Sequence, residues 1–303
     1  MQRIPASLIG SLVLVAFALV ACGPGSSPSA SPSPTAEPTA SAQPSLAADL
    51  LDRRWTVLYV GSDLNATRET NGDPMNTDAL MLVSLSADQS RLTLVSLPRD
   101  TVDVPLADGT VYEHKINRLY RDEGMEALVG AMETLYGVPI DAHVMLDMDD
   151  FTALVDAVGT IEVSPETPLA DPKVDLDIEA GPQEIDAATA NAYVRTRVDQ
   201  DYGRMGRQQE VFLALVAKLV DPQTDIDPEA LIDGLDSLET DVPLDELPTL
   251  IELARRAADA EVERLLIEPP LITFEGDRGD GRGYVLEPDI EAIRAEVQGL
   301  IGE

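Results

Sequence analysis

The sequence of 303 residues contains little cysteine, little histidine and little positive charge. Its single cysteine, Cys22, excludes an internal disulfide, and two histidines leave too few ligands for a zinc site of the usual kind. Only 21 lysines and arginines stand against 55 aspartates and glutamates, which gives a formal net charge of -34. Because nucleic acids are bound by basic surfaces, this acidity argues against a nucleic acid partner.

No long membrane-spanning apolar run is apparent, but a shorter one lies near the N-terminus. Residues 8–20 follow Arg3, and the run ends in Leu19-Val20-Ala21-Cys22-Gly23. Its length is typical of an export signal. Its end resembles the bacterial lipobox, in which the cysteine is lipidated and becomes the first residue of the mature protein. We therefore expect residues 1–21 to be a lipoprotein signal peptide, with a cleaved signal and an incidental cysteine as the alternative.

The composition changes twice along the rest of the chain. Residues 22–48 are rich in serine, proline and alanine, with Glu37 as the only charge, and predict a disordered tether after the lipid anchor. Residues 49–303 are long enough for one large domain with its own core. No linker-like composition separates the motif-bearing part, 55–220, from the tail, 221–303, which we expect to be a helical extension of the same domain.

Strand-like and helix-like patterns alternate through this domain, which predicts an α/β sandwich. The runs at 79–85 and 91–97 are separated by a short polar segment and predict a hairpin. Further strands are predicted at 55–60, 143–146, 160–163 and 262–267. Helices are predicted at 124–136, 150–158, 186–195, 206–220, 227–238, 244–258 and 289–301.

The few cations are concentrated in one segment, residues 193–209, which holds Arg195, Arg197, Arg204 and Arg207. Guanidinium groups are always charged and bind phosphate oxygens two at a time, so this cluster indicates a phosphorylated ligand. Arg204 and Arg207 are three residues apart, and we expect them to share a face at a helix start, where the helix dipole favours an anion. Solvated pairs with neighbouring carboxylates are the alternative.

Several short motifs occur in a fixed order along the chain. They are Gly61-Ser62-Asp63, Asn76-Thr77-Asp78, Leu-Val-Ser-Leu-Pro-Arg-Asp at 94–100, Lys-Ile-Asn at 115–117, Tyr-Val-Arg-Thr-Arg at 193–197 and Gly-Arg-Met-Gly-Arg-Gln-Gln at 203–209. Each motif alone is weak, but the ordered set over about 55–220 strongly resembles the LytR-CpsA-Psr family of bacterial cell-wall enzymes.

This resemblance implies a three-layer α/β/α sandwich with a central mixed sheet and an apolar tunnel for a polyprenyl chain. It also implies a phosphotransferase that moves a glycopolymer, such as teichoic acid or capsule, from an undecaprenyl-pyrophosphate carrier to a peptidoglycan sugar hydroxyl. The products would be a phosphodiester and the lipid phosphate. We expect a monomer that works outside the cell membrane and is held there by the lipid on Cys22.

The resemblance also assigns roles to individual residues. Asp63 and Asp78 match the family's carboxylates associated with Mg²⁺, and they are expected to act in catalysis together with Arg99, Arg197 and Arg204. The expected pyrophosphate ligands are Arg99, Lys115, Arg195, Arg197, Arg204, Arg207 and Gln208. Physical chemistry supports such a set, because phosphoryl transfer needs positive charge and positioning, and Mg²⁺ needs few carboxylates besides water and phosphate.

Simpler interpretations of these residues remain open. Asp63 and Asp78 also suit loop-capping aspartates, Arg99 suits a pair with Asp100 or Asp103 at a sheet end, and Lys115 suits a solvated turn. At the level of function, hydrolysis of the pyrophosphate and non-catalytic binding of polyprenyl phosphates by an envelope regulator are the alternatives. One departure stands out, since many family members carry an arginine where this chain has Asn76.

Overall fold

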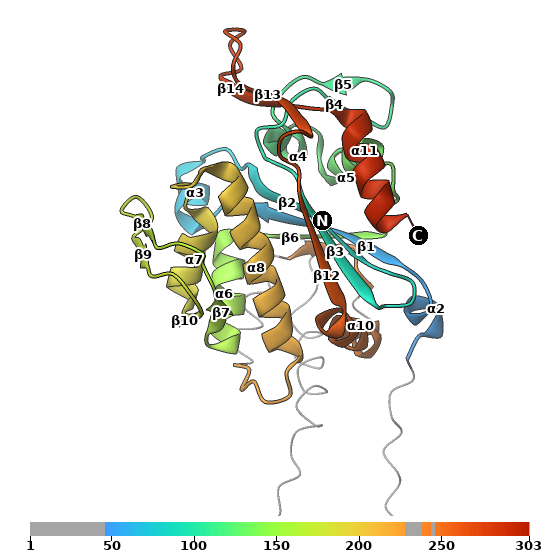
Figure 1. Ribbon diagram of the computed structural model, residues 1–303, viewed down its shortest axis with the longest axis vertical. Helices are drawn as coiled ribbons and strands as arrows, with labels where there is room; N and C mark the ends of the chain where they lie inside the picture. The colour runs from blue at the N-terminus through green and yellow to red at the C-terminus, as the bar shows by residue number, and fades with distance from the viewer. Residues whose placement is uncertain (1–45, 228–237, 244–245, 303) are drawn as a thin grey trace, which may run out of the picture.

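A six-stranded mixed sheet forms the centre of the computed structural model, which describes residues 46–227, 238–243 and 246–302 (Figure 1). Its strand order is β11-β6-β1-β2-β3-β12. The β1–β2, β2–β3 and β6–β11 pairs are antiparallel, whereas β1–β6 and β3–β12 are parallel. The strands are β1 (Trp55–Ser62), β2 (Thr77–Leu85), β3 (Arg91–Ser96), β6 (Ala142–Leu146), β11 (Glu239–Thr240) and β12 (Glu261–Leu266). The predicted mixed sheet and its hairpin of β2 and β3 are confirmed.

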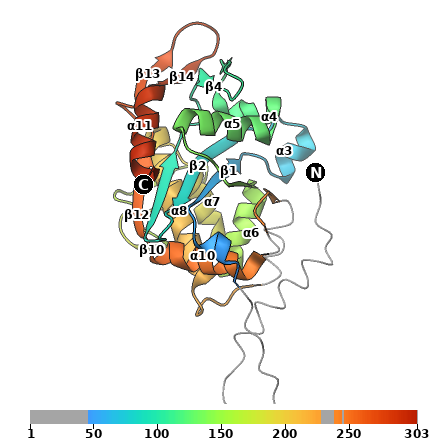
Figure 2. The same cartoon turned by 90° about the vertical axis from the view of Figure 1, so that its right-hand side faces the viewer.

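Both faces of the sheet are buried, because apolar residues on β2 point alternately to its two sides. Leu80 and Leu82 belong to the core under α5 (Met125–Tyr136) and α11 (Ile290–Ile301). Met81 and Leu85 belong to the core on the opposite face, which includes residues of α8 and α10. The latter helices are α8 (Gln200–Val220) and α10 (Leu247–Asp259). Figure 2 shows the sheet between these helices, which confirms the three-layer α/β/α sandwich.

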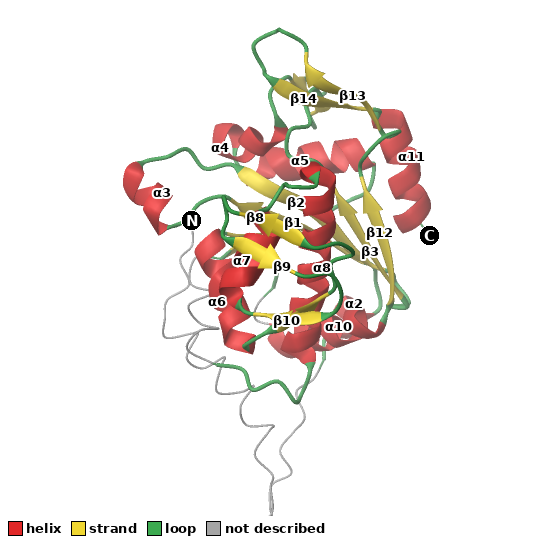
Figure 3. Cartoon of the chain, turned by 60° about the vertical axis from the view of Figure 1, so that its left-hand side comes forward, coloured by secondary structure: helices red, strands yellow, loops and turns green. Residues whose placement is uncertain are grey.

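A second group of helices and short strands packs beside α8 (Figure 3). It contains α6 (Met148–Val158) and α7 (Ala187–Arg195), whose first turns are capped by the side chains of Asp147 and Asp186. Two small antiparallel pairs complete this group. They are β7 (Ile161–Val163) with β10 (Gln183–Ile185), and β8 (Leu169–Asp171) with β9 (Leu176–Ile178).

The remaining short elements lie around the edges of the sheet. A bridge between Thr101 and Leu286 joins the segment after β3 to the C-terminal hairpin of β13 and β14. No helix in the described ranges is both long and apolar enough to cross a membrane. The edge elements are α2 (Ala48–Leu51), α3 (Ala66–Asn71), β4 (Val104–Pro105), β5 (Val111–Tyr112), a 3-10 turn (Ile116–Arg118), α4 (Leu119–Glu123), β13 (Ile272–Asp277) and β14 (Tyr284–Pro288).

Some predictions fall outside the described residues. These are the signal peptide, Cys22, the tether up to residue 45, and most of the helix predicted at 227–238. The predicted start of another helix was wrong, since α8 begins at Gln200 rather than at residue 206. Glycines are poor helix formers, yet Gly203 and Gly206 both lie inside α8. Arg204 and Arg207 therefore do not lie in the first turn of a helix, and the helix dipole is not expected to favour an anion beside them.

Candidate functional site

A cavity of about 640 Å³ lies between the sheet and the helices α6 and α8. Most of its wall is apolar, with side chains from strands β1, β2 and β6 on one side and from the two helices on the other. Typical lining residues are Val57, Tyr59, Phe151, Leu154, Phe212 and Leu215. Such a wall suits a hydrocarbon chain, because removing apolar surface from water drives its binding.

One part of the same cavity is charged. Five arginines and three aspartates line it, in a chain whose acidic residues greatly outnumber its basic ones. The cavity therefore joins an apolar wall to a cation-rich end, an arrangement that fits a ligand with a hydrocarbon tail and an anionic head. The charged lining residues are Arg68, Arg99, Arg195, Arg197, Arg204, Asp63, Asp78 and Asp147.

A β-bulge positions Asp78 at this end. In the β1–β2 ladder Gly61 faces Ala79 while Ser62 faces Thr77, so Asp78 is the extra residue on its strand. Bulges redirect side chains and are common beside active sites. The strands also approach closely here, because a Cβ added at Gly61 would lie 3.0 Å from the Cβ of Ala79.

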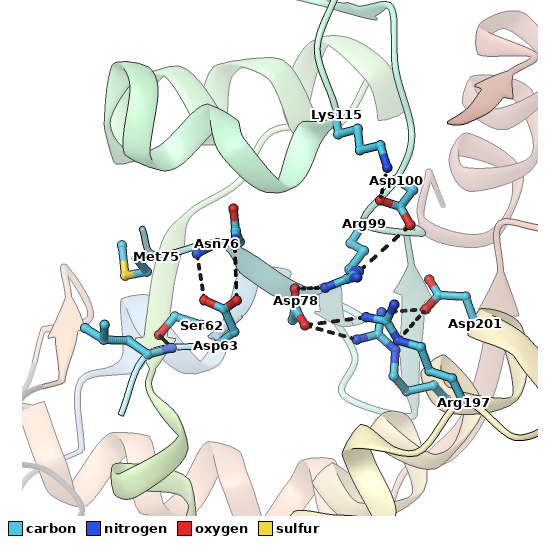
Figure 4. Close-up of polar contacts among 12 residues, drawn as sticks. Ser62, Asp63, Met75, Asn76, Asp78, Arg99, Asp100, Lys115, Arg197 and Asp201 are labelled. Carbon is cyan, nitrogen blue, oxygen red and sulfur yellow. Dashed lines mark hydrogen bonds and ion pairs between the residues drawn. The ribbon is translucent and has the colours of Figure 1, made fainter. Parts of the chain in front are cut away.

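Three arginines surround the carboxylate of Asp78 (Figure 4 labels two of them). Arg99 Nη1 lies 2.5 Å from Oδ1, whereas Arg197 Nη2 and Arg204 Nη1 lie 3.5 and 3.6 Å from Oδ2. Burial alone would lower the pKa of Arg99, but the charge and hydrogen bond of Asp78 raise it above its ordinary value. Arg99 also lies 3.9 Å from Asp100, so the predicted alternative pairing is present together with the cavity contact.

Lys115 lies outside the cavity lining and pairs with Asp100 instead, with Nζ 3.0 Å from Oδ1 (Figure 4). The backbone after it supports the loop that carries Arg99. The amide of Asn117 donates to the carbonyl of Arg99 at 3.2 Å, and that of Ile116 donates to Thr101 at 2.8 Å. The structure thus gives the Lys-Ile-Asn motif a supporting position, one contact away from the charged end.

Arg204 is almost completely buried, with 2% of its side chain exposed. Its Nη2 lies 2.8 Å from Asp201 Oδ1, yet neither Nη2 nor Nε has a hydrogen-bond partner among the described residues. Burial lowers the pKa of Arg204 to about 10; the charge of Asp201 opposes this shift and that of Arg197 adds to it. The side chain therefore remains a cation at neutral pH. Buried donors without partners are costly, so these N–H groups favour an anionic ligand.

Arg207 is buried as well but is not part of the cavity lining. It donates to the carbonyls of Tyr193 at 2.9 Å and Thr196 at 2.6 Å, and to Asp199 at 2.6 Å. Asp199 can reach it because Gly203 has no side chain, since a Cβ there would lie 2.2 Å from Asp199 Oδ2. Arg207 therefore ties α7 to α8, and the structure does not bring it to the other arginines.

Two further predicted residues do line the cavity. Arg195 is exposed, and its one hydrogen bond within the described residues is a 3.3 Å contact with Asn191. Gln208 donates to the carbonyl of Val194 at 3.3 Å. Both thus line the cavity, although neither has, like Arg204, a buried donor without a hydrogen-bond partner among the described residues.

Asp63 is held on the side of the charged end away from Arg99 (Figure 4). Its Oδ1 accepts from the amide of Asn76 at 2.8 Å, and its Oδ2 accepts from Asn76 Nδ2 at 3.1 Å and from Arg68 Nη1 at 2.5 Å. The loop-capping interpretation of Asp63 therefore describes part of its contacts. It does not exclude a second role, because Asp63 also lines the cavity.

Three charged residues of this region were missed by sequence reasoning. Arg68 and Asp147 line the cavity, and Asp201 lies between Arg197 and Arg204. A signal for the helix carrying Arg68 was present, because Asn65 caps it and Gly72, at φ 70°, ends it. Asp201 had no such signal, since its position depends on the true start of α8.

The comparison with protein families decides the assignment. The model of the LytR_cpsA_psr family matches residues 29–296. The chain belongs to this family. Among curated relatives, the probable cell wall biosynthesis protein LcpB of Corynebacterium glutamicum is 38% identical over 155 residues, which are 50% of this chain and 36% of LcpB. The chain thus matches little more than a third of the length of that relative.

Two further relatives cover more of the chain. The polyisoprenyl-teichoic acid–peptidoglycan teichoic acid transferase TagU of Halalkalibacterium halodurans is 29% identical over 225 residues, 73% of this chain and 71% of TagU. The crystal structure of Bacillus subtilis TagV has a TM-score of 0.63 at 23% identity and covers 83% of this chain and 98% of TagV. The structural similarity to TagV supports the fold described for this LytR_cpsA_psr protein.

Proposed function

We propose that this LytR_cpsA_psr protein is a phosphotransferase that moves a glycopolymer from an undecaprenyl-pyrophosphate carrier to a peptidoglycan sugar hydroxyl. One observation carries the proposal: the cavity joins an apolar wall to an end lined by five arginines. A polyprenyl diphosphate has the matching chemistry, with a long hydrocarbon chain on an anionic head. The name of TagU, a transferase of polyisoprenyl-linked teichoic acid to peptidoglycan, supports the same class of donor and acceptor.

In the proposed reaction the acceptor hydroxyl oxygen attacks the phosphorus next to the glycan. The bond from that phosphorus to the bridging oxygen breaks, and the polyprenyl phosphate leaves with the bonding electrons. In the ligand-free structure the carboxylate of Asp78 pairs with Arg99, Arg197 and Arg204. These arginines would turn to the phosphate oxygens as the oxygens gain negative charge. The hydroxyl proton needs an acceptor, for which Asp63 and Asp78 are the candidate carboxylates.

We also propose Mg²⁺ as the cofactor, held by Asp63 and Asp78. The donor set fits, because both carboxylates line the cavity, Asp63 directly after β1 and Asp78 on the adjacent β2, and carboxylate oxygens are ligands that Mg²⁺ prefers. The described residues contain no cluster of three metal-binding side chains, so the remaining ligands would be water and phosphate. When bound, the ion would neutralise charge on the two phosphates.

The location is part of the proposal. Cys22 and the signal peptide lie outside the described residues, and lipidation of Cys22 would place the domain at the membrane surface where the lipid carrier lies. Replacement of Cys22 by alanine is expected to move the protein from the membrane fraction to the soluble fraction of fractionated cells. Retention of this variant in the membrane would contradict the anchor and leave the cavity chemistry untouched.

The test of the activity uses the full chain in detergent with a polyprenyl-pyrophosphate oligosaccharide and Mg²⁺, with and without a peptidoglycan oligomer. A phosphodiester-linked adduct together with polyprenyl phosphate is the expected result, and it should be lost on chelation of Mg²⁺ and restored by adding it back. Release of oligosaccharide phosphate without any adduct would instead show a hydrolase. Binding without turnover would show a non-catalytic protein.

A further inference from the structure

Arg68 lines the charged end of the cavity from a direction of its own. It lies on α3, the six-residue helix between β1 and β2, whereas the other lining arginines follow β3 or lie on and between α7 and α8. A hydrogen bond of 2.7 Å from the amide of Ala66 to Asp149 ties α3 to α6. A second, of 3.1 Å, joins the amide of Met148 to the carbonyl of Leu64. These contacts fix Arg68 at the edge of the cavity.

The guanidinium of Arg68 is only partly used by the protein. Nη1 lies 2.5 Å from Asp63 Oδ2, and Nη2 donates to the carbonyl of Pro74 at 2.8 Å. The third donor, Nε, is buried and has no hydrogen-bond partner in the described part of the chain. Arg204 shows the same pattern, with a carboxylate nearby and buried N–H groups left over. A ligand oxygen would satisfy such a group.

The charged end therefore contains two anion-binding places. Arg99, Arg197 and Arg204 surround Asp78, while Arg68 is the only described cation that pairs with Asp63. Ser62 pairs with Thr77 across neighbouring strands about 5 Å apart, Asp63 and Asp78 are the next residues along the chain, and both carboxylates line the same cavity. Two adjacent places for negative charge correspond to the two adjacent phosphates of a diphosphate.

Asp63 would keep its position if Arg68 turned towards a ligand. The amide and side-chain nitrogens of Asn76 both donate to it, at 2.8 and 3.1 Å. Asn76 is held in turn, because its Oδ1 accepts from Arg121 Nη1 at 3.1 Å. Losing the contact with Arg68 would therefore not leave a carboxylate without partners, and this removes the main obstacle to a shared role for Arg68.

We propose that Arg68 binds the second phosphate of a polyprenyl diphosphate, so that it sets the preference of the cavity for a diphosphate over a monophosphate. This assignment rests on the proposed function, in which the cavity takes a polyprenyl-linked phosphate. Arg99, Arg197 and Arg204 bind the phosphate that both ligands share. Arg68 meets only the additional one, and its removal should affect the two ligands differently.

The experiment measures the Kd of farnesyl diphosphate and farnesyl monophosphate for the full chain in detergent by calorimetric titration. Wild type is expected to favour the diphosphate. Arg68→Ala should reduce that preference about tenfold, as expected for one charge-assisted hydrogen bond, and Arg68→Lys should recover part of it. Arg53→Ala is the matched control, because Arg53 also pairs with an aspartate, Asp141 at 2.7 Å, but does not line the cavity.

Each outcome separates this proposal from the wider function. An unchanged preference in Arg68→Ala, with a melting temperature like that of wild type, would overturn the role of Arg68 and leave the proposed function intact. An equal loss of affinity for both ligands would also overturn it, because Arg68 would then act only through Asp63. If wild type binds neither ligand, the proposed function fails as well. Should Arg68→Ala not fold, Arg68→Gln gives the same comparison with a side chain closer in shape.

Discussion

The helix α8 carries two buried arginines, three residues apart, in very different environments. Arg207 donates from Nε and both terminal nitrogens, to two backbone carbonyls and to Asp199. Arg204 is buried to a similar degree, yet its Nε and Nη2 have no hydrogen-bond partner among the described residues. A buried cation is tolerated when it is paired and hydrogen-bonded, so the environment of Arg207 is complete and that of Arg204 is not.

Within one motif, this difference distinguishes an arginine with complete hydrogen bonding from one with incomplete hydrogen bonding. Arg204 lies beside the cavity, Asp78 and Asp201; its Nη2 forms an ion pair with Asp201, but neither Nη2 nor Nε has a hydrogen-bond partner among the described residues. The surroundings of Arg207 are the end of α7 and the segment that follows it. The two arginines of the segment Gly-Arg-Met-Gly-Arg therefore have different contacts, and we expect different roles for them; the number of hydrogen-bonded donors distinguishes them better than burial does.

The largest effect is expected for Arg204→Met, which removes the charge but keeps a long side chain. Transfer activity should fall by about 10²–10³-fold, as for the loss of one donor to a developing oxyanion. The free energy of unfolding should change by less than about 1 kcal/mol, because Asp78 keeps Arg99 and Arg197, and Asp201 keeps Arg197, so neither carboxylate is left without a cation. Transfer assays and urea unfolding measure the two quantities.

If Arg204→Met keeps activity within threefold of wild type, the interpretation of Arg204 as a ligand-binding residue is wrong, because its N–H groups without hydrogen bonds would then bind no ligand. A fall of several kcal/mol in the free energy of unfolding would also contradict it, since Arg204 would then stabilise the fold as Arg207 is expected to do. Arg264→Met is a control that removes one positive charge, as Arg204→Met does. Arg264 lies outside the cavity lining and donates to Gln209 at 2.8 Å, so Arg264→Met should leave transfer unchanged.

Arg207→Met should show the opposite pattern. It leaves two carbonyl groups and the carboxylate of Asp199 without their donor, so the free energy of unfolding should fall by about 2–4 kcal/mol. The activity of the molecules that remain folded should stay within about fivefold of wild type. Chemical unfolding, followed by an assay below the unfolding transition, tests both parts. A hundredfold loss of ligand affinity in a variant as stable as wild type would show that Arg207 belongs to the binding site.

Sequence reasoning predicted the fold well where local patterns and the core agree. The strands 79–85 and 91–97 and the helices 124–136, 150–158 and 186–195 all occur close to their predicted positions. The start of α8 was missed, since the prediction began at Gly206 whereas the helix begins at Gln200 and contains Gly203. The role of Gly203 is to leave room for Asp199, and that depends on a contact between side chains which no local pattern contains.

The candidate site shows the same limit. The ordered motifs indicated Asp63, Asp78, Arg99, Arg197 and Arg204, and the structure brings all five to one cavity, although their roles remain predictions. No pattern in the sequence could show that two other predicted ligands, Lys115 and Arg207, lie outside the cavity lining. Their positions depend on which carboxylate the folded chain offers them: Asp100 for the lysine at 115 and Asp199 for the arginine at 207.

A smaller effect is expected for Asp78→Asn. This carboxylate competes with a ligand for Arg99, Arg197 and Arg204, so its neutralisation should free those cations for an anion. Without Mg²⁺, farnesyl diphosphate should bind about tenfold more tightly to the variant than to wild type. Titration in the presence of a chelator measures the change. Weaker binding would mean that Asp78 holds the three arginines in place, and the environment of Arg204 would then depend on it.

The smallest effect is expected for Arg195→Ala. Arg195 lines the cavity but is exposed, and its hydrogen bond to Asn191, the one it makes in the described part of the chain, is long at 3.3 Å. Water and salt screen such a charge, so the affinity for farnesyl diphosphate should fall less than about threefold, and the difference should vanish at high ionic strength. A salt-resistant loss of tenfold or more would show that Arg195 contacts the phosphate directly. The exposure of an arginine side chain in the ligand-free protein would then not predict whether it binds the ligand. The difference between Arg204 and Arg207 would then rest only on the number of their donors without hydrogen bonds.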